Sequence, residues 1–387
     1  MTFNILEPSL YEKARLPLAQ AETLPRWCYT SAEFADAEVR EIFRKTWNFV
    51  GRVDEVPSSG AYFTVDLFGE SIIVVRDRAN GIHAFANTCR HRGTRLVNGT
   101  GRCSAFACPY HSWTYALSGE LIGAPGMEGV AGFAKADYGL IPVRLETWGG
   151  FMFVNLDRNG KPLLEHLGNA VDTFAPYNFE NMVVTRKKEY DLACNWKIYV
   201  ENAMEDYHTA TVHRVSIGTQ VCTREESIGE WDAVHMLAAT TVAILPGEVS
   251  PFPYIPTLKG KSAGGTYFSV VYPNWFFAST QDCMWWLHVA PRGPKRCLVT
   301  QGSVFSRETS ERPDFKQVVQ KYYQRWDKSI PEDNAIAEMQ QAGLESSFSQ
   351  PGRLSLHEPV VHAMAQWVLD RVLSGNGRRL TNGRGTK

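Results

Sequence analysis

The chain has 387 residues, 44% of them hydrophobic, so it is long enough for one large or two medium domains with sizeable cores. Basic and acidic residues nearly balance, and the formal net charge is −1. This balance gives no electrostatic reason to expect nucleic acid or an anionic membrane as a partner.

The N-terminus and the cysteines favour a soluble cytoplasmic protein. Residues 1–8 have neither a basic region nor an apolar core, so they do not form a signal peptide. The most apolar long stretch, 234–245, is too short to span a bilayer. Six cysteines without regular spacing are expected to be free, mostly buried thiols: Cys28, Cys103, Cys194, Cys222, Cys283 and Cys297.

The first 156 residues predict an irregular arm, one helix and then a β domain. Residues 1–29 are polar with scattered prolines, and Thr-Ser-Ala-Glu at 30–33 matches a capping box. A helix should follow, with apolar residues at helical spacing as far as Trp47. Alternating patterns then predict strands at 61–67, 70–76, 82–87, 143–146 and 150–155, with a hairpin between 114 and 122.

The most informative stretch of this β region runs from Cys89 to His111. Its frame is Cys-x-His, sixteen residues, then Cys-x-x-His, so each short arm offers one thiolate and one imidazole. Side chains alternate along an extended loop, which places Cys89 and His91 on one face. Gly93 and Pro109 suit tight turns beside them. The spacing predicts a metal centre held by Cys89, His91, Cys108 and His111.

Zinc and a two-iron cluster are the candidates for this centre. Structural zinc sites usually have Cys-x2–4-Cys and His-x3–5-His arms, whereas both arms here are mixed. A mixed pair in each arm suits a cluster in which two cysteines hold one iron and two histidines hold the other. Neutral histidines raise the potential of such a cluster, which then serves as a one-electron relay.

Beyond Pro162 the pattern changes to helices and long strands. Helices are predicted at 163–175 and 195–210, with a strand at 183–192 between them. Several strand-like runs predict a large antiparallel sheet: 267–272, 275–279, 284–290 and 297–304. Further helices are predicted at 313–328, 335–346 and 359–374.

The predicted helix at 195–210 carries a second set of metal-binding residue types. On a continuous helix Glu205 and His208 share one face, whereas His213, five residues beyond His208, does not. Both histidines can therefore bind one metal only if the helix ends or bulges between them. Two histidines and a carboxylate form the facial triad of non-haem Fe(II) oxygenases. The alternative is two unrelated histidines around a helix end.

The two stretches together resemble the catalytic alpha subunit of the Rieske non-haem iron oxygenases, over nearly the whole chain. Residues 109–113 (Pro-Tyr-His-Ser-Trp) match the Rieske motif. The catalytic-domain pattern matches at Asn202, Glu205, His208 and His213. The resemblance implies an α+β fold, with an all-β Rieske [2Fe–2S] domain followed by a helix-grip (START-like) domain of antiparallel sheet and helices.

The resemblance also assigns the cofactors. It implies that Cys89 and Cys108 bind one iron of the cluster, and that His91 and His111 bind the other. A mononuclear Fe(II) would be bound by His208, His213 and a third ligand in the segment 331–338, assigned to Asp333. Glu332 and Glu338 are the alternatives for the third ligand. From its position alone, Asp333 could equally cap a following helix.

Glu205 stands where the family usually has aspartate. There this residue is not an iron ligand but bridges an iron-binding histidine to a Rieske histidine of a neighbouring subunit, within a ring that is usually a trimer. The resemblance implies a homotrimer with a bridge from His208 through Glu205 to the partner subunit's His111, and it places Asn202 with Glu205 in the catalytic machinery. Glutamate here resembles the branch that oxidises quaternary ammonium compounds such as carnitine and glycine betaine.

The implied activity is that of the oxygenase component of a multicomponent system that uses O2 and NAD(P)H electrons. The chain lacks Gly-x-Gly-x-x-Gly after a strand and Cys-x4-Cys-x2-Cys, so a separate flavin- or ferredoxin-type reductase is expected. The favoured substrate is a quaternary ammonium compound, oxidised by monooxygenation with C–N cleavage. The alternative is hydroxylation or demethylation of an aromatic acid. Aromatic rings suit both, and the predicted pocket residues are Tyr207, Trp275, Phe277 and Trp286.

Two other classes of protein remain compatible with the motifs. One is a Rieske electron-transfer protein without mononuclear iron, and the other is a zinc-dependent structural or interaction protein. The predicted organisation is an N-terminal arm and helix packed on the catalytic domain (1–45), a Rieske domain (46–156), a catalytic domain (157–375) and a disordered tail (376–387).

Overall fold

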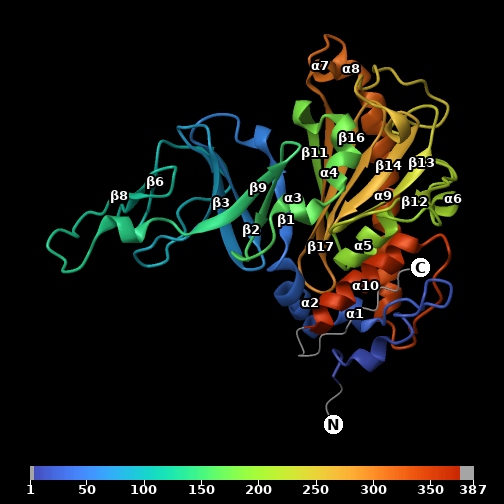
Figure 1. Cartoon of the computed structure of the whole chain (residues 1–387), viewed down its shortest axis with the longest axis horizontal. Coiled ribbons are helices and arrows are strands. Elements are labelled where there is room, and N and C mark those ends of the chain that lie inside the picture. The colour runs from blue at the N-terminus through green and yellow to red at the C-terminus, as the bar shows by residue number, and fades with distance from the viewer. Residues whose placement is uncertain (1–3, 375–387) are drawn as a thin grey trace. The chain divides into compact units, whose positions relative to one another are not determined.

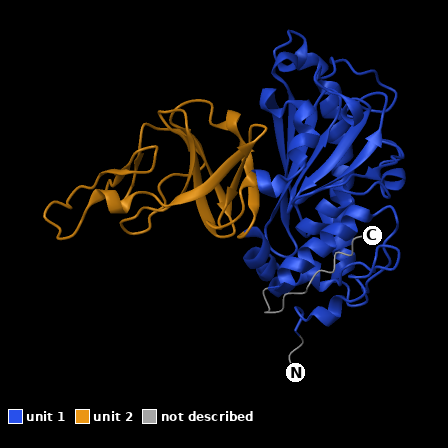
Figure 2. Ribbon diagram, viewed as in Figure 1, with its two compact units in different colours: residues 1–43, 164–387 blue, residues 44–163 orange. Residues whose placement is uncertain are grey.

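The computed structural model describes residues 4–374, which divide into two compact units (Figure 2). The smaller unit comprises residues 44–163. The larger unit combines the N-terminal segment up to Phe43 with the chain from Leu164 onward. The predicted tail at 376–387 lies outside the described residues. Within residues 4–374, no helix combines the length and the apolarity needed to cross a bilayer.

The smaller unit is built on a seven-stranded antiparallel sheet in the order β1-β10-β9-β4-β3-β2-β5. Its strands are β1 (Trp47–Arg52), β2 (Ala61–Leu67), β3 (Glu70–Arg76), β4 (Ile82–Ala86), β5 (Thr100–Arg102), β9 (Pro142–Trp148) and β10 (Phe151–Asn155). A three-stranded sheet follows, formed by β6 (Phe106–Ala107), β7 (Thr114–Tyr115) and β8 (Leu121–Gly123). The strands predicted at 61–67 and 70–76 are confirmed.

A single apolar cluster lies around the Cys/His arms of this unit. It includes Cys89, Cys108, Trp113 and Tyr115, all of them buried. Cys103 packs against the edge of the same cluster as a half-buried free thiol. The two arms are thus fixed to a core rather than held on a free loop.

The larger unit contains a seven-stranded antiparallel sheet in the order β11-β17-β16-β15-β14-β13-β12 (Figure 1). Its strands are β11 (Met182–Leu192), β12 (Thr223–Arg224), β13 (Trp231–Leu237), β14 (Gly265–Val271), β15 (Trp275–Ser279), β16 (Met284–Pro291) and β17 (Cys297–Ser306). The α-helices of the chain are α1 (Trp27–Thr30), α2 (Ala32–Glu38), α3 (Leu163–Leu167), α4 (Ala170–Phe174), α5 (Trp196–Ala203), α6 (Thr209–Val212), α7 (Arg307–Ser310), α8 (Phe315–Val318), α9 (Gln320–Glu345) and α10 (Pro359–Ser374).

Aromatic residues show how the helices cover the two faces of this sheet. Trp326 of α9 packs against Trp285 of β16, with 5.6 Å between ring centroids. On the other face, Phe174 of α4 packs edge-on against Phe277 of β15 at 4.9 Å. Successive residues of a strand point to opposite faces, so α9 and α4 contact alternate side chains of β15 and β16.

Several helix predictions need correction at their boundaries. The helices predicted at 313–328 and 335–346 are joined, because α9 continues through Pro331. Proline removes one hydrogen-bond donor and costs about 3 kcal/mol in a helix interior. The buried residues on both sides, including Trp326 and Ala337, hold α9 together by packing. The first helix, α2, begins one residue later than the capping box predicts, because Ser31 rather than Thr30 is its N-cap. Trp47, predicted at the end of this helix, belongs to β1.

Replacing Gly302 by alanine is expected to destabilise the larger unit. A Cβ at Gly302 would come within 2.1 Å of the ring of Trp286, its partner across β16 and β17. Overpacking of this kind costs about 1–3 kcal/mol and lowers the thermal unfolding midpoint, which calorimetry measures. Gly343→Ala in α9 is the matched control, because its added methyl would meet nothing within 4 Å. An unchanged midpoint in Gly302→Ala would contradict this packing.

Candidate active site

The four Cys and His residues of the smaller unit lie on two similar tight turns. The first arm follows β4, and the second lies between β6 and β7. The carbonyl oxygen of Cys89 accepts a hydrogen bond from the amide of Gly93 at 2.9 Å, and that of Cys108 accepts one from Ser112 at 3.0 Å. Gly93 and Ser112 both have positive φ, which bends each arm back on itself.

The turns bring like side chains together in pairs. The rings of His91 and His111 are 4.8 Å apart, and Nδ1 of His111 is buried without a hydrogen-bond partner. Burial raises the pKa of the Cys108 thiol, but backbone hydrogen bonds from Tyr110 and His111 outweigh this and lower it overall. Two paired thiols and two paired imidazoles, one with an unused ring nitrogen, fit a centre with one all-cysteine iron and one all-histidine iron.

Two aromatic residues hold these arms in place. The indole of Trp113 stacks on the ring of His91 at 4.9 Å, with 9° between the planes. The hydroxyl of Tyr115 lies 3.2 Å from Sγ of Cys89 and accepts a hydrogen bond from the amide of Arg90. Hydrogen bonds to the sulfur ligands of such clusters tune their reduction potential.

In the larger unit, the chain breaks its helix before the two histidines. Helix α5 ends at Ala203, and the one-turn helix α6 has His208 at its N-cap and His213 at its C-cap. The prediction of one helix over 195–210 is therefore wrong. The break satisfies the condition under which both histidines can face one metal.

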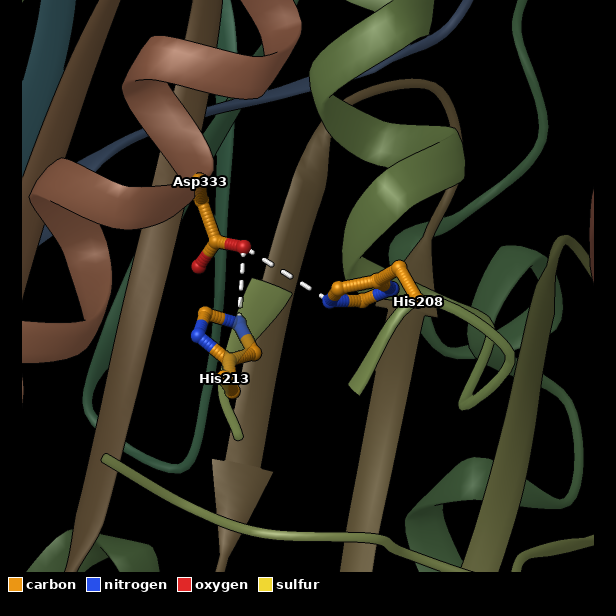
Figure 3. A group of neighbouring side chains, drawn as sticks. All are labelled: His208, His213 and Asp333. Carbon is orange, nitrogen blue, oxygen red and sulfur yellow. Dashed lines mark ion pairs between the residues drawn. The ribbon is translucent and has the colours of Figure 1, made fainter. Parts of the chain in front are cut away.

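Three side chains converge on one point in this unit (Figure 3). The ligand atoms of His208, His213 and Asp333 all lie within 4.8 Å of one another. Oδ1 of Asp333 is 2.9 Å from Nε2 of His213 and 3.6 Å from Nε2 of His208. Neighbouring ligands about 2.1 Å from one ion are separated by roughly 3 Å, so these distances suit a shared metal.

The charge and burial of the three residues also fit a cation. Oδ1 of Asp333 is buried, and its contacts lack hydrogen-bond geometry. Burial lowers the pKa of His213, but the carboxylates of Asp333 and Glu332 outweigh it and raise this pKa above its ordinary value. A field that favours a proton on His213 equally favours a metal ion between the three side chains.

Each histidine is oriented by its own glutamate. Nδ1 of His208 lies 2.5 Å from Oε1 of Glu205, and Nδ1 of His213 lies 2.7 Å from Oε2 of Glu332. Ser216 donates a further hydrogen bond to Glu332. Both histidines therefore direct Nε2 to the common point, as metal-binding histidines with carboxylate partners do. Glu338, the other alternative ligand, instead accepts a hydrogen bond from the amide of Ala193.

A cavity of about 70 Å³ adjoins the three ligand atoms. Asn202 and Glu205 line it beside His208, His213 and Asp333. Its apolar wall comes from the sheet and includes Val234, Phe268, Phe276, Trp285 and Leu287. Helix α9 adds Arg325, Ser329 and Ile330. Glu205 and His208 also line a second cavity, of about 200 Å³.

The predicted substrate-pocket residues are not among those that line this cavity. Trp275, Phe277 and Trp286 alternate with the lining residues of β15 and β16, so they point to the other face of the sheet. Tyr207 is 63% exposed and stacks on His357. Three of the four predicted residues thus lie on the opposite face of the sheet from this cavity, whose lining includes Phe268, Phe276, Trp285 and Arg325.

Comparison with known families identifies the chain. Residues 179–374 match the family described as "Ring hydroxylating alpha subunit (catalytic domain)", and residues 46–134 match "Rieske [2Fe-2S] domain". The chain belongs to the Rieske oxygenase alpha subunits. Its cofactors are accordingly a Rieske [2Fe–2S] cluster and a mononuclear iron, and this oxygenase is an oxidoreductase.

The oxygenase is similar over most of its length to proteins with named substrates. It is 30% identical to a glycine betaine monooxygenase oxygenase subunit of Chromohalobacter salexigens, over 91% of this chain and 86% of that protein. It is 28% identical to a chloroplastic choline monooxygenase of Arabidopsis thaliana, over 90% of this chain and 82% of that protein.

Solved structures share its fold. A quaternary ammonium Rieske monooxygenase in complex with L-carnitine superposes with a TM-score of 0.75 at 24% identity, covering 90% of this chain and 95% of that one. The naphthalene 1,2-dioxygenase of Rhodococcus sp. gives a TM-score of 0.78 at 19% identity, covering 96% and 99%. The prediction of a β Rieske domain followed by a catalytic domain of antiparallel sheet and helices is confirmed.

Glu332→Ala is expected to lower the affinity of the mononuclear site for Fe(II) by about 10–100-fold, because His213 loses the carboxylate that orients it. Fe(II) titration of the iron-depleted site measures this, while the visible spectrum of the cluster reports that the smaller unit is intact. Glu338→Ala, on the same helix, is the matched control and should keep its affinity. The reverse ranking would show that Glu338, not Glu332, supports the metal.

Proposed function

We propose that this oxygenase catalyses the monooxygenation of a small quaternary ammonium compound, with cleavage of a C–N bond. The observation that carries the proposal is the convergence of His208, His213 and Asp333 beside a small cavity with an aromatic wall. Relatives named as glycine betaine and choline monooxygenases support this substrate class.

Each cofactor has a proposed set of ligands in this chain. Cys89 and Cys108 would hold one iron of the cluster, and His91 and His111 the other. His208, His213 and Asp333 would hold the mononuclear iron. When bound, the cluster relays single electrons and the mononuclear iron activates O2. The electrons come from NAD(P)H through a separate reductase.

The overall reaction balances for an N-methyl group. One C–H bond, O2, two electrons and two protons give an N-hydroxymethyl group and one water. The hydroxymethyl group then loses the proton of its hydroxyl, the C–N bond breaks, and the electron pair stays on nitrogen. The products are a tertiary amine and formaldehyde. NAD(P)H supplies both electrons, so one is consumed per O2.

The residues around the site serve three purposes in this reaction. Glu205 keeps the proton of His208 on Nδ1, and Glu332 does the same for His213, so both Nε2 atoms stay free for the metal. Phe268 and Phe276 attract a cation through their ring faces, and together with Trp285 they limit the access of water.

Glu205 is also proposed to carry electron transfer between subunits. Its carboxylate contacts Nδ1 of His208, and the residue also lines the second cavity, which lies beside the site. We propose a homotrimer in which Glu205 links His208 to the partner subunit's His111. The glutamate keeps the hydrogen-bonding carboxylate of the usual aspartate, with one more methylene of reach.

Oxidation of an aromatic acid is the second candidate function. The observation that favours it is the buried guanidinium of Arg325 beside the aromatic wall, since this pair could bind a carboxylate and a ring.

With NADH, O2 and a surrogate Rieske-oxygenase reductase, the fully loaded enzyme is expected to release formaldehyde from a quaternary amine. It should contain about three irons and two acid-labile sulfides per chain. Asp333→Ala should retain two irons, two sulfides and the cluster spectrum, but form no product. Full turnover by Asp333→Ala would refute the ligand assignment. A wild type with only two irons would indicate an electron-transfer protein, and zinc without sulfide would indicate a structural protein.

Glu205→Ala is expected to lower turnover by roughly 10–100-fold while the cluster spectrum stays unchanged, because the proposed bridge is lost. Glu205→Asp is the matched control and should keep more activity, since it retains the carboxylate. Single-turnover reduction of the mononuclear iron, followed by freeze-quench spectroscopy, locates the defect. Normal electron transfer in Glu205→Ala would rule out the bridge.

A further inference from the structure

We infer that Arg325 binds a carboxylate group of the substrate, so that the substrate is a betaine rather than an amino alcohol. The inference rests on the proposed function and narrows it. Glycine betaine and carnitine, named for relatives or bound in structures of similar fold, carry a trimethylammonium and a carboxylate. Choline, named for another relative, carries the same ammonium but a hydroxyl in place of the carboxylate.

Arg325 lies on the side of α9 that faces the metal site. Arg325, Ser329 and Asp333 are four residues apart along α9, so they lie on one side of the helix. All three line the cavity that contains the ligand atoms. A ligand held by Arg325 therefore shares one cavity with the metal-binding carboxylate.

Arg325 is buried without an ionic partner. Its side chain is 5% exposed, Nε has no hydrogen-bond partner, and one terminal nitrogen donates to Ser329 at 3.1 Å. Among residues 4–374, no carboxylate lies within ion-pair distance of this guanidinium. Other arginines of the larger unit are paired: Arg186 with Asp327, Arg224 with Asp232 and Arg371 with Glu230.

A buried charge without a partner lowers the stability of the folded protein unless a group of opposite charge binds to it. Burial lowers the pKa of Arg325 to about 10, and the carboxylates of Asp333 and Glu332 partly oppose this, so the side chain is still charged at neutral pH. A guanidinium presents parallel N–H groups that match the two oxygens of a carboxylate. A substrate carboxylate would supply the missing partner.

The wall of the cavity keeps the two ends of a betaine apart. The guanidinium lies over the ring of Trp285, 4.9 Å from its centroid, and this contact holds it against the cavity wall. The rings of Phe268 and Phe276 stack at 6.5 Å with 20° between their planes, and no cation lies over either ring among the described residues. The carboxylate would meet Arg325, and the trimethylammonium would meet the phenylalanines.

Choline would meet two obstacles in the same cavity. It brings a second positive charge near Arg325, and it leaves the guanidinium unpaired. Sites built to bind a polar group discriminate strongly against analogues that lack it. We expect kcat/KM for glycine betaine to exceed that for choline by about 100-fold or more.

The test compares glycine betaine, choline and benzoate with the fully loaded oxygenase, its surrogate reductase, NADH and O2. Arg325→Gln should raise KM for glycine betaine by about 100-fold, change kcat less, and alter the parameters for choline less than about threefold. Arg325→Lys should restore part of the loss because it restores the charge. Lys328→Gln is the matched control, since it removes an exposed positive charge from the same helix.

A binding measurement separates failure of the contact between Arg325 and the substrate carboxylate, here called the anchor, from failure of the proposed function. Without O2, glycine betaine should protect the wild type against thermal unfolding more than choline does, and Arg325→Gln should abolish the difference. If choline is used as well as glycine betaine, or Arg325→Gln weakens both equally, the anchor is refuted. If only benzoate is oxidised and its KM depends on Arg325, the anchor stands and the quaternary ammonium proposal is refuted.

Discussion

Three ligand atoms from two distant segments must meet within one buried cavity, and much of the larger unit follows from this constraint. His208 and His213 lie at the two ends of a one-turn helix, while Asp333 comes from α9, 120 residues further along the chain. An imidazole or a carboxylate placed there without partners would be costly to bury. The site is therefore stable only if its surroundings fix every side chain and a cation compensates the carboxylate.

Helix α9 contributes most of the residues that fix this site. It supplies the proposed ligand Asp333, the orienting carboxylate of Glu332 and the guanidinium of Arg325, and its Trp326 packs against the sheet that forms the cavity wall. A break at Pro331 would separate the ligand from the packed half of the helix. The continuity of α9 through a proline is thus tied to the geometry of the site as well as to the core.

Sequence reasoning succeeded where the signal was local. The strands at 61–67 and 70–76, the strand at 275–279 and the helix at 359–374 all match, because alternation and helical spacing are properties of short segments. The predicted bounds of the helix before His208 were wrong: α5 ends at Ala203, and beyond it the side chain of Glu205 contacts the amide and Nδ1 of His208. The continuity of α9 was missed for a different reason: Pro331 favours a break locally, whereas packing on both sides keeps the helix continuous.

The position of the predicted pocket residues depended on a feature that the sequence does not show. Trp285 and Trp286 are equally aromatic, and only the register of β16 in the sheet decides which of them faces the cavity. That register depends on which face α9 covers, and no short pattern encodes it. Arg325 was missed because a lone arginine in an amphipathic helix usually lies at the surface; its significance appears only once the structure shows that no carboxylate accompanies it.

Electrostatics links these observations. The charged groups that line the cavity are Glu205, Asp333 and Arg325. With a divalent ion bound, the positive charges exceed the negative ones by one. A betaine adds no net charge and can place its carboxylate on the positive side, whereas choline adds a further positive charge to a confined site where Coulomb interactions are stronger than in water.

The aromatic wall alone would accept both compounds, because cation–π attraction depends on the ammonium that they share. Under the proposed function, discrimination between them would have to come from a group that responds to the other end of the molecule, and Arg325 is the lining cation available for that purpose among the residues that the structure describes.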